Sequence, residues 1–181
     1  FYKKNNAYNT KKVFDFCYIL RPVTINEFTS HFHVNIKVND IQKKKFFFKH
    51  IKSKFIIKSY AERYRYKNQL GNYELAKLFN IERNKVDNNF KNIFKSEILI
   101  FDYLSTMIFE VINLNKPIIL IIDKKDHFLS TYGKIFLNNF EELGMLFSSH
   151  SQILNMVKSN PNFFKDYVKK WNQINNQNKI K

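Results

Sequence analysis

Two hydroxyl-bearing residues, Ser105 and Thr106, stand directly before an apolar segment with helical spacing. The first turn of a helix has backbone N–H groups without partners and the positive end of the helix dipole, so it can hold a phosphate group. Glu110 follows about one helical turn later, where its carboxylate can accept hydrogen bonds from sugar hydroxyls. Residue order alone leaves a second interpretation open, in which Ser105 is a simple N-cap and Glu110 a solvated carboxylate.

Further candidates for ligand binding stand just beyond other apolar runs. A guanidinium group pairs well with phosphate, although a solvated loop arginine is the alternative for each arginine. An imidazole beside a carboxylate, as in His127 next to Asp126, can serve as an acid or a base. These further candidates are Asp102, Arg21, Arg63, Tyr64 and His127.

Several kinds of site find no support in the sequence. There is no glycine-rich loop of the dinucleotide-binding or Walker type. The single cysteine, Cys17, excludes an internal disulfide and a cysteine-based metal site, and its apolar surroundings are typical of a buried thiol. No metal-ligand spacing stands out either. We therefore expect neither a metal nor a bound cofactor.

The elements that would position the hydroxyl turn form a strand-helix-strand unit. Residues 98–101 and 118–122 are apolar without alternation, as in strands that are buried on both faces of a parallel sheet. Residues 107–114 have helical spacing, and Pro117 favours an end to that helix before Lys116. A right-handed crossover is expected, with ligands beyond the strand ends at residues 102–106.

The remaining segments fit the same architecture within one domain. The length of 181 residues suits a single α/β domain with a sizeable core. We expect a flexible N-terminal segment over residues 1–12, a Rossmann-like domain over 13–174 and a frayed tail over 175–181. Gly144 fits a helix stop. Further strands are predicted at 13–20, 55–58 and 145–147, and further helices at 38–51, 70–79, 130–143, 149–157 and 162–174.

The net charge of +16 is open to two interpretations. It is typical of proteins that bind nucleic acid, anionic lipid or phosphorylated ligands. However, Lys, Asn, Ile, Phe and Tyr are all enriched together, as expected if an AT-rich genome biases residue choice. No apolar run reaches membrane-spanning length and no signal peptide is visible, and because the chain begins with Phe1 we expect residues upstream of it.

One arrangement of residues resembles a known family. Asp102-Tyr103, Ser105-Thr106 and Phe109-Glu110, followed by Asn115-Lys116-Pro117 and an apolar strand, resemble the C-terminal half of GT-B-type transferases that build bacterial surface carbohydrate. The similarity extends to the surface-carbohydrate transferases of spirochaetes and to the glycerophosphotransferases of teichoic-acid synthesis. Residues 132–136 and 142–147 look like the helix and the following segment of the spirochaete-type proteins. The resemblance covers residues 55–170.

The resemblance implies a Rossmann-like parallel sheet flanked by helices, acting as the donor-binding half of a GT-B-type transferase. The donor would be a nucleotide-sugar or nucleotide-polyol and the acceptor a carbohydrate, in the cytoplasm and with contact to the inner face of the membrane. Ser105 and Thr106 would hold donor phosphates and Glu110 the donor sugar, with Arg63 and Tyr64 in the loop after an earlier strand. The alternative function is a non-enzymatic basic module that binds nucleic acid or anionic membrane.

Overall fold

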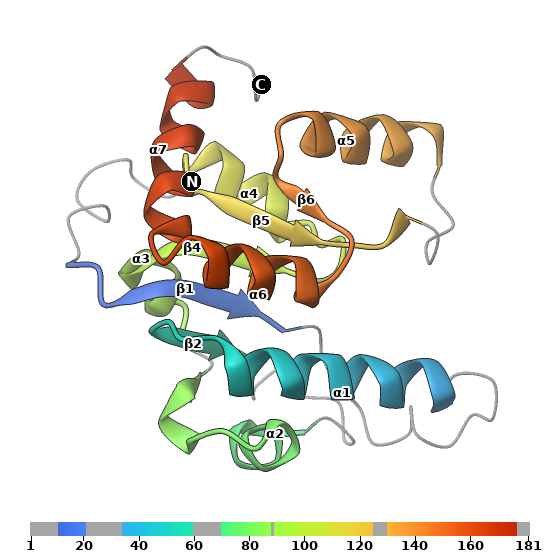
Figure 1. Ribbon diagram of the computed structural model, residues 1–181, viewed down its shortest axis with the longest axis vertical. Coiled ribbons are helices and arrows are strands. Elements are labelled where there is room, and N and C mark those ends of the chain that lie inside the picture. The colour runs from blue at the N-terminus through green and yellow to red at the C-terminus, as the bar shows by residue number, and fades with distance from the viewer. Residues whose placement is uncertain (1–10, 21–33, 60–69, 88, 125–129, 177–181) are drawn as a thin grey trace.

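Six parallel strands form one sheet in the computed structural model, which describes residues 11–20, 34–59, 70–87, 89–124 and 130–176. The strand order is β3-β2-β1-β4-β5-β6, with helices packed against the sheet (Figure 1). This arrangement confirms the predicted α/β, Rossmann-like fold. The strands are β1 (Phe14–Ile19), β2 (Phe55–Lys58), β3 (Val86–Asp87), β4 (Ser96–Phe101), β5 (Ile118–Ile121) and β6 (Leu146–Phe147).

The two central strands, β1 and β4, lie far apart in sequence. They pair in parallel with Phe16 opposite Ile98 and Ile19 opposite Phe101. On its other side, β1 pairs with β2, so that Phe16 also lies opposite Phe55. The order of the strands therefore reverses between β1 and β4: the first half of the chain builds outward from β1, and the second half builds outward from β4.

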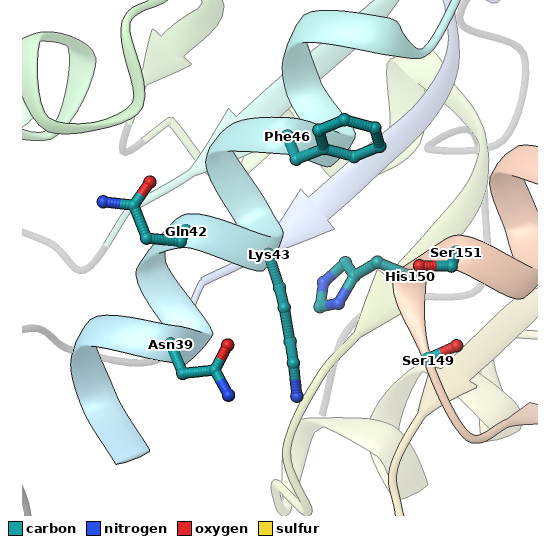
Figure 2. Close-up of a pocket in the computed structure, with 7 residues that line it drawn as sticks. All are labelled: Asn39, Gln42, Lys43, Phe46, Ser149, His150 and Ser151. Atoms are coloured by element: carbon teal, nitrogen blue, oxygen red, sulfur yellow. The ribbon is translucent and has the colours of Figure 1, made fainter. Parts of the chain in front are cut away.

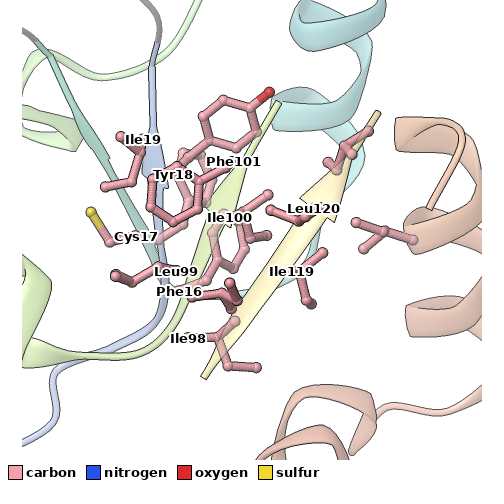
Figure 3. Close-up of a cluster of buried hydrophobic side chains, with 14 of the residues drawn as sticks. Phe16, Cys17, Tyr18, Ile19, Ile98, Leu99, Ile100, Phe101, Ile119 and Leu120 are labelled. Carbon is pink, nitrogen blue, oxygen red and sulfur yellow. The ribbon is translucent and has the colours of Figure 1, made fainter. Parts of the chain in front are cut away.

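The central strands have apolar side chains on both faces because helices cover both faces of the sheet. Residues 98–101 of β4 are all 0% exposed, which agrees with their uninterrupted apolar sequence. Figure 3 shows these side chains packed with those of β1 and β5. Cys17 is fully buried within this cluster, as the sequence predicts, and burial raises the pKa of its thiol to about 12.

Six of the seven helices in the described part of the chain agree closely with the predicted segments. Only their ends differ by a few residues, and the largest difference is at the start of α1, four residues earlier than predicted. The short 3-10 turn η3 (Arg83–Lys85) leads into β3. The helices are α1 (Val34–His50), α2 (Asn72–Phe79), α3 (Lys91–Lys95), α4 (Met107–Asn113), α5 (Thr131–Glu142), α6 (His150–Ser159) and α7 (Phe163–Asn176).

Aromatic side chains on β1 identify the helices that cover one face of the sheet. The ring of Phe16 contacts Phe47 of α1 and Phe164 of α7, with centroid separations of 6.1 and 5.3 Å. The ring of Tyr18 contacts Phe47 and Phe48 of α1. Each buried Phe side chain contributes about 1.5–3 kcal/mol through removal of apolar surface from water. The face bearing Phe16 and Tyr18 therefore packs on α1, α6 and α7, which lie along it in Figure 1.

Left-handed residues end the two helices that lead into β5 and β6. Gly144 follows α5 with φ +67°, and its N–H donates to the Glu141 carbonyl at 2.8 Å, as the predicted helix stop requires. Asn115 follows α4 with φ +53° and its N–H donates to Ile112 at 2.8 Å. These tight ends turn the chain directly back into β6 and β5. Of the helices that the structure describes, none combines the length and the apolar character needed to cross a membrane.

Candidate functional site

The carboxyl ends of β1 and β4 lie next to each other at the middle of the sheet. From these two ends the chain continues in opposite directions, toward β2 on one side and toward β5 on the other. Ligands of parallel α/β proteins bind at such a reversal, beyond the carboxyl ends of the strands. The turn at residues 102–106, which follows β4 directly, therefore lies where the fold favours a ligand.

The hydroxyl groups of this turn lie at the start of α4, as predicted. The Ser105 hydroxyl accepts a hydrogen bond from the Met107 N–H at 3.2 Å. Thr106 occupies the N-cap position, but its side chain makes no capping hydrogen bond and is exposed. Glu110, in the first turn of α4, is also exposed. Their roles toward phosphate and sugar stay predictions.

Asp102, the first residue after β4, faces the protein interior. Its side chain is 6% exposed and forms an ion pair with Lys44 of α1, which is 8% exposed. Lys44 also donates to Asp40 Oδ2 at 2.6 Å. Burial acts to lower the pKa of Lys44, but the carboxylates of Asp102 and Asp40 outweigh it and raise that pKa. Asp102 thereby ties α1 to the end of β4, and its buried Oδ1 has no hydrogen-bond partner among the described residues.

A second buried polar pair lies beside the first. The Tyr18 hydroxyl and His150 Nε2 are 2.8 Å apart, and the two rings are stacked with centroids 6.0 Å apart. Burial lowers the pKa of His150 to about 4. Burial and the nearby Asp102 carboxylate raise the pKa of Tyr18 well above its ordinary value. Both side chains are therefore neutral at neutral pH, and the pair fixes the first residue of α6 against β1.

An open cleft of about 300 Å³ lies between α1 and the start of α6 (Figure 2). The α1 wall presents Asn39, Gln42, Lys43 and Phe46. The α6 wall consists of residues 149–151, with serines on both sides of His150. Because α6 begins three residues after β6 ends, this cleft belongs to the carboxyl edge of the sheet, like the turn after β4.

Comparison with known proteins identifies the family of this chain. Residues 2–180 match the LIC12162 family transferase. The chain belongs to this transferase family. Searches among curated proteins and among solved structures gave no significant match. The LIC12162 family assignment agrees with the transferase class that the sequence predicts.

Four of the residues predicted for this LIC12162 family member's site lie outside the described residues: Arg21, Arg63, Tyr64 and His127. Their predicted roles therefore rest on the sequence alone, in which they follow the ends of β1, β2 and β5. Within the described ranges, no three His, Cys, Asp or Glu side chains come together in a way that could hold a metal ion.

Sequence reasoning missed the buried polar residues of this site, namely Tyr18, Lys44 and His150. A signal was present for Lys44, since it shares a helical face with Phe47, Phe48 and Ile51, all of which are buried. Lys44 can be buried there because the Asp102 and Asp40 carboxylates compensate its charge. The sequence near His150 carries no comparable signal, because its partner Tyr18 is distant in the chain.

Proposed function

We propose that this chain is the donor-binding half of a GT-B-type transferase. It binds a nucleotide-activated sugar or polyol phosphate, whose activated group passes to a carbohydrate acceptor during synthesis of bacterial surface polysaccharide. Three features support the proposal: the transferase family, the Rossmann-like strand order, and the sequence resemblance around residues 102–117. The net charge of +16 suits an anionic donor.

The observation that carries the proposal is the position of Ser105 and Thr106. They begin α4 at the carboxyl edge, beside the point where the strand order reverses. In the proposed complex, their hydroxyls and the nearby amides hold the donor phosphates and stabilise negative charge on the departing nucleotide. Glu110, one turn along α4, accepts hydrogen bonds from the donor's sugar hydroxyls.

Arginines complete the proposed phosphate site. Arg21 follows β1 in sequence, and Arg63 follows β2. In the sheet, β1 is the neighbour of β4 and β2 is the next strand beyond β1. A guanidinium group can donate two parallel hydrogen bonds to one phosphate. We further propose that the protein lies in the cytoplasm and that its lysines contact anionic lipid at the inner face of the membrane.

Isothermal titration calorimetry of the full chain with a set of nucleoside diphosphates tests this function. The double variant Ser105→Ala/Thr106→Ala should bind nucleotide about tenfold more weakly, because it loses two hydrogen-bonding hydroxyls. Ser130→Ala/Thr131→Ala is a matched control, since it removes the same two groups from the start of α5, after the neighbouring strand β5. It should bind nucleotide normally.

Two outcomes contradict the proposed function. One is a lack of affinity for any nucleoside diphosphate, and the other is an equal loss of affinity in both double variants. Steep salt dependence of binding to nucleic acid or anionic vesicles, without an effect of Ser105→Ala/Thr106→Ala, would instead support the basic binding module.

A further inference from the structure

We propose that the cleft between α1 and the start of α6 binds the carbohydrate acceptor. The role in transfer rests on the proposed function, whereas binding of a hydroxyl-rich ligand rests on the cleft itself. Its volume of about 300 Å³ suits a small-molecule ligand.

The side chains that line the cleft match the chemistry of sugar hydroxyls. A hydroxyl both donates and accepts hydrogen bonds, and so do the side chains of Asn39, Gln42, Ser149 and Ser151. Lys43 adds one further donor from the α1 wall, and Figure 2 shows it facing His150 across the cleft. The lining therefore offers many neutral partners and a single charge.

Phe46 supplies the apolar contact that a sugar ring also needs. The Phe46 side chain is 53% exposed, whereas Phe47 and Phe48, the next two residues of α1, are buried. The Phe46 ring lies beside that of His50, with the two centroids 4.1 Å apart. An aromatic ring fixed in this way gives the C–H face of a sugar a flat apolar surface to pack on. The combination of one exposed ring with amide and hydroxyl groups favours a carbohydrate over a purely anionic ligand.

The walls of the cleft are held in place from behind. On α1, Lys44 follows the lining residue Lys43, and its ammonium group pairs with Asp102. Phe47 follows the lining residue Phe46, and its ring centroid lies 5.3 Å from that of His150. On α6, the bond to Tyr18 fixes the His150 ring. Because these contacts exist without ligand, little ordering of the cleft is needed on binding.

The position of the cleft suits a reaction between two bound molecules. The Lys44–Asp102 pair connects the α1 wall to the residue that opens the proposed donor turn after β4. The proposed donor turn and the cleft therefore both lie at the carboxyl edge of the sheet. The acceptor would bind beside α1 and the donor beside α4. The two proposed ligands would therefore bind at the same edge of the sheet.

NMR titration of the ¹⁵N-labelled full chain with methyl β-D-glucopyranoside and with methyl N-acetyl-β-D-glucosaminide tests this inference. The amide shifts should be largest at residues 149–151 and along α1 from Asn39 to Phe46. Phe46→Ala and Gln42→Ala should each weaken glycoside binding about three- to tenfold, the size expected for loss of one ring contact or one hydrogen bond.

Matched controls separate the cleft from general effects on the surface. Phe109→Ala removes a ring that is 57% exposed on α4, and Gln173→Ala removes an exposed amide on α7. Both should leave the glycoside affinity unchanged, and thermal unfolding should show that all four variants are folded.

Three results would overturn the inference: no shifts in the cleft with either glycoside, unchanged affinity in Phe46→Ala and Gln42→Ala, or shifts there with inorganic phosphate but not with glycosides. Calorimetry with nucleoside diphosphate on the same variants distinguishes this inference from the proposed function. Glycoside binding without nucleotide binding would contradict only the donor site, and nucleotide binding without glycoside binding would contradict only the cleft.

Discussion

His150 is a titratable side chain that folding keeps neutral. It is 6% exposed, and its Nε2 lies 2.8 Å from the Tyr18 hydroxyl at the centre of the sheet. Burial lowers the pKa of His150 to about 4, below the ordinary value of 6.5. Between these two values the unfolded chain binds a proton at this residue that the folded protein does not bind. Stability from this site is therefore complete above pH 6.5 and is lost as the pH falls toward 4.

We predict that acidification from pH 7 to pH 4.5 lowers the free energy of unfolding, with His150 contributing on the order of 3 kcal/mol. Urea unfolding at a series of pH values measures this change. His150→Gln, which does not titrate, should flatten the profile in this interval. The control His50→Gln removes an exposed imidazole from α1 and should keep the slope. An equal slope in the wild type and His150→Gln would contradict the assignment.

At the scale of elements, the Lys44–Asp102 ion pair joins α1 to the end of β4. Both side chains are more than nine-tenths buried, and each charge depends on the other for compensation. The second carboxylate, Asp40, is 48% exposed and can be hydrated by itself. The pair therefore contributes mainly when both partners are present, because an isolated buried charge is costly.

We predict that Lys44→Met destabilises the protein by about 3–5 kcal/mol, since it leaves the Asp102 carboxylate buried without its partner. The double variant Lys44→Met/Asp102→Leu should regain most of this loss. Chemical denaturation of the wild type, both single variants and the double variant gives the coupling energy. Lys49→Met, on the exposed face of α1, should change the stability little. Simple additivity of the two single effects would contradict a coupled pair.

The individual helices and strands could be predicted from the sequence, because each depends on a local pattern of residues. The order of the strands in the sheet could be predicted only in part. The runs at 98–101 and 118–122 predict buried strands because no polar residue interrupts them, and β4 and β5 begin and end within two residues of these runs. The parallel unit around α4 follows from the same pattern. Pairing of β1 with β4 depends on contacts across the chain, and no local spacing encodes it.

The candidate site divides in the same way. Ser105 and Thr106 were identifiable because a helix start has a local signature, and both lie at the start of α4. Lys44 and His150 join the site through Asp102 and Tyr18, which are distant in sequence. The cleft between α1 and α6 likewise exists only once both helices have packed on the same face of the sheet.

At the scale of the whole molecule, α7 connects the two halves of the sheet. Its Phe164 ring lies 5.3 Å from Phe16 on β1, and its Tyr167 hydroxyl donates to the Ile118 carbonyl on β5. The indole N–H of Trp171 donates to Asn115 Oδ1 at 3.2 Å, at the turn between α4 and β5. Because α7 contacts strands from both halves, the halves should unfold together.

We predict that Trp171 fluorescence and far-UV circular dichroism report one coincident urea transition. Trp171 is the only tryptophan and is 1% exposed, so its emission reports the docking of α7. Glycine tolerates the φ of +53° at position 115, so Asn115→Gly removes only the side chain that accepts the Trp171 hydrogen bond. This variant should lower the free energy of unfolding by about 1 kcal/mol and shift both midpoints together.

Asn80→Gly is the matched control for this prediction. Asn80 has a φ of +55° at the end of α2, and its exposed side chain makes no hydrogen bond within the described part of the chain. The midpoints should therefore stay close to those of the wild type. Two separate transitions in the wild type would contradict a single cooperative unit.

The pairing of β1 with β4 also has a consequence for synthesis on the ribosome. β1 leaves the ribosome before β2 and can pair with it once both have emerged, but the other edge of β1 stays unpaired until β4, which begins at Ser96, has emerged. During that interval the nascent chain presents an unpaired, apolar parallel strand, and such edges template association with other chains. Chaperone binding to the nascent chain should therefore be strongest after β2 has left the exit tunnel and should fall once β4 has emerged.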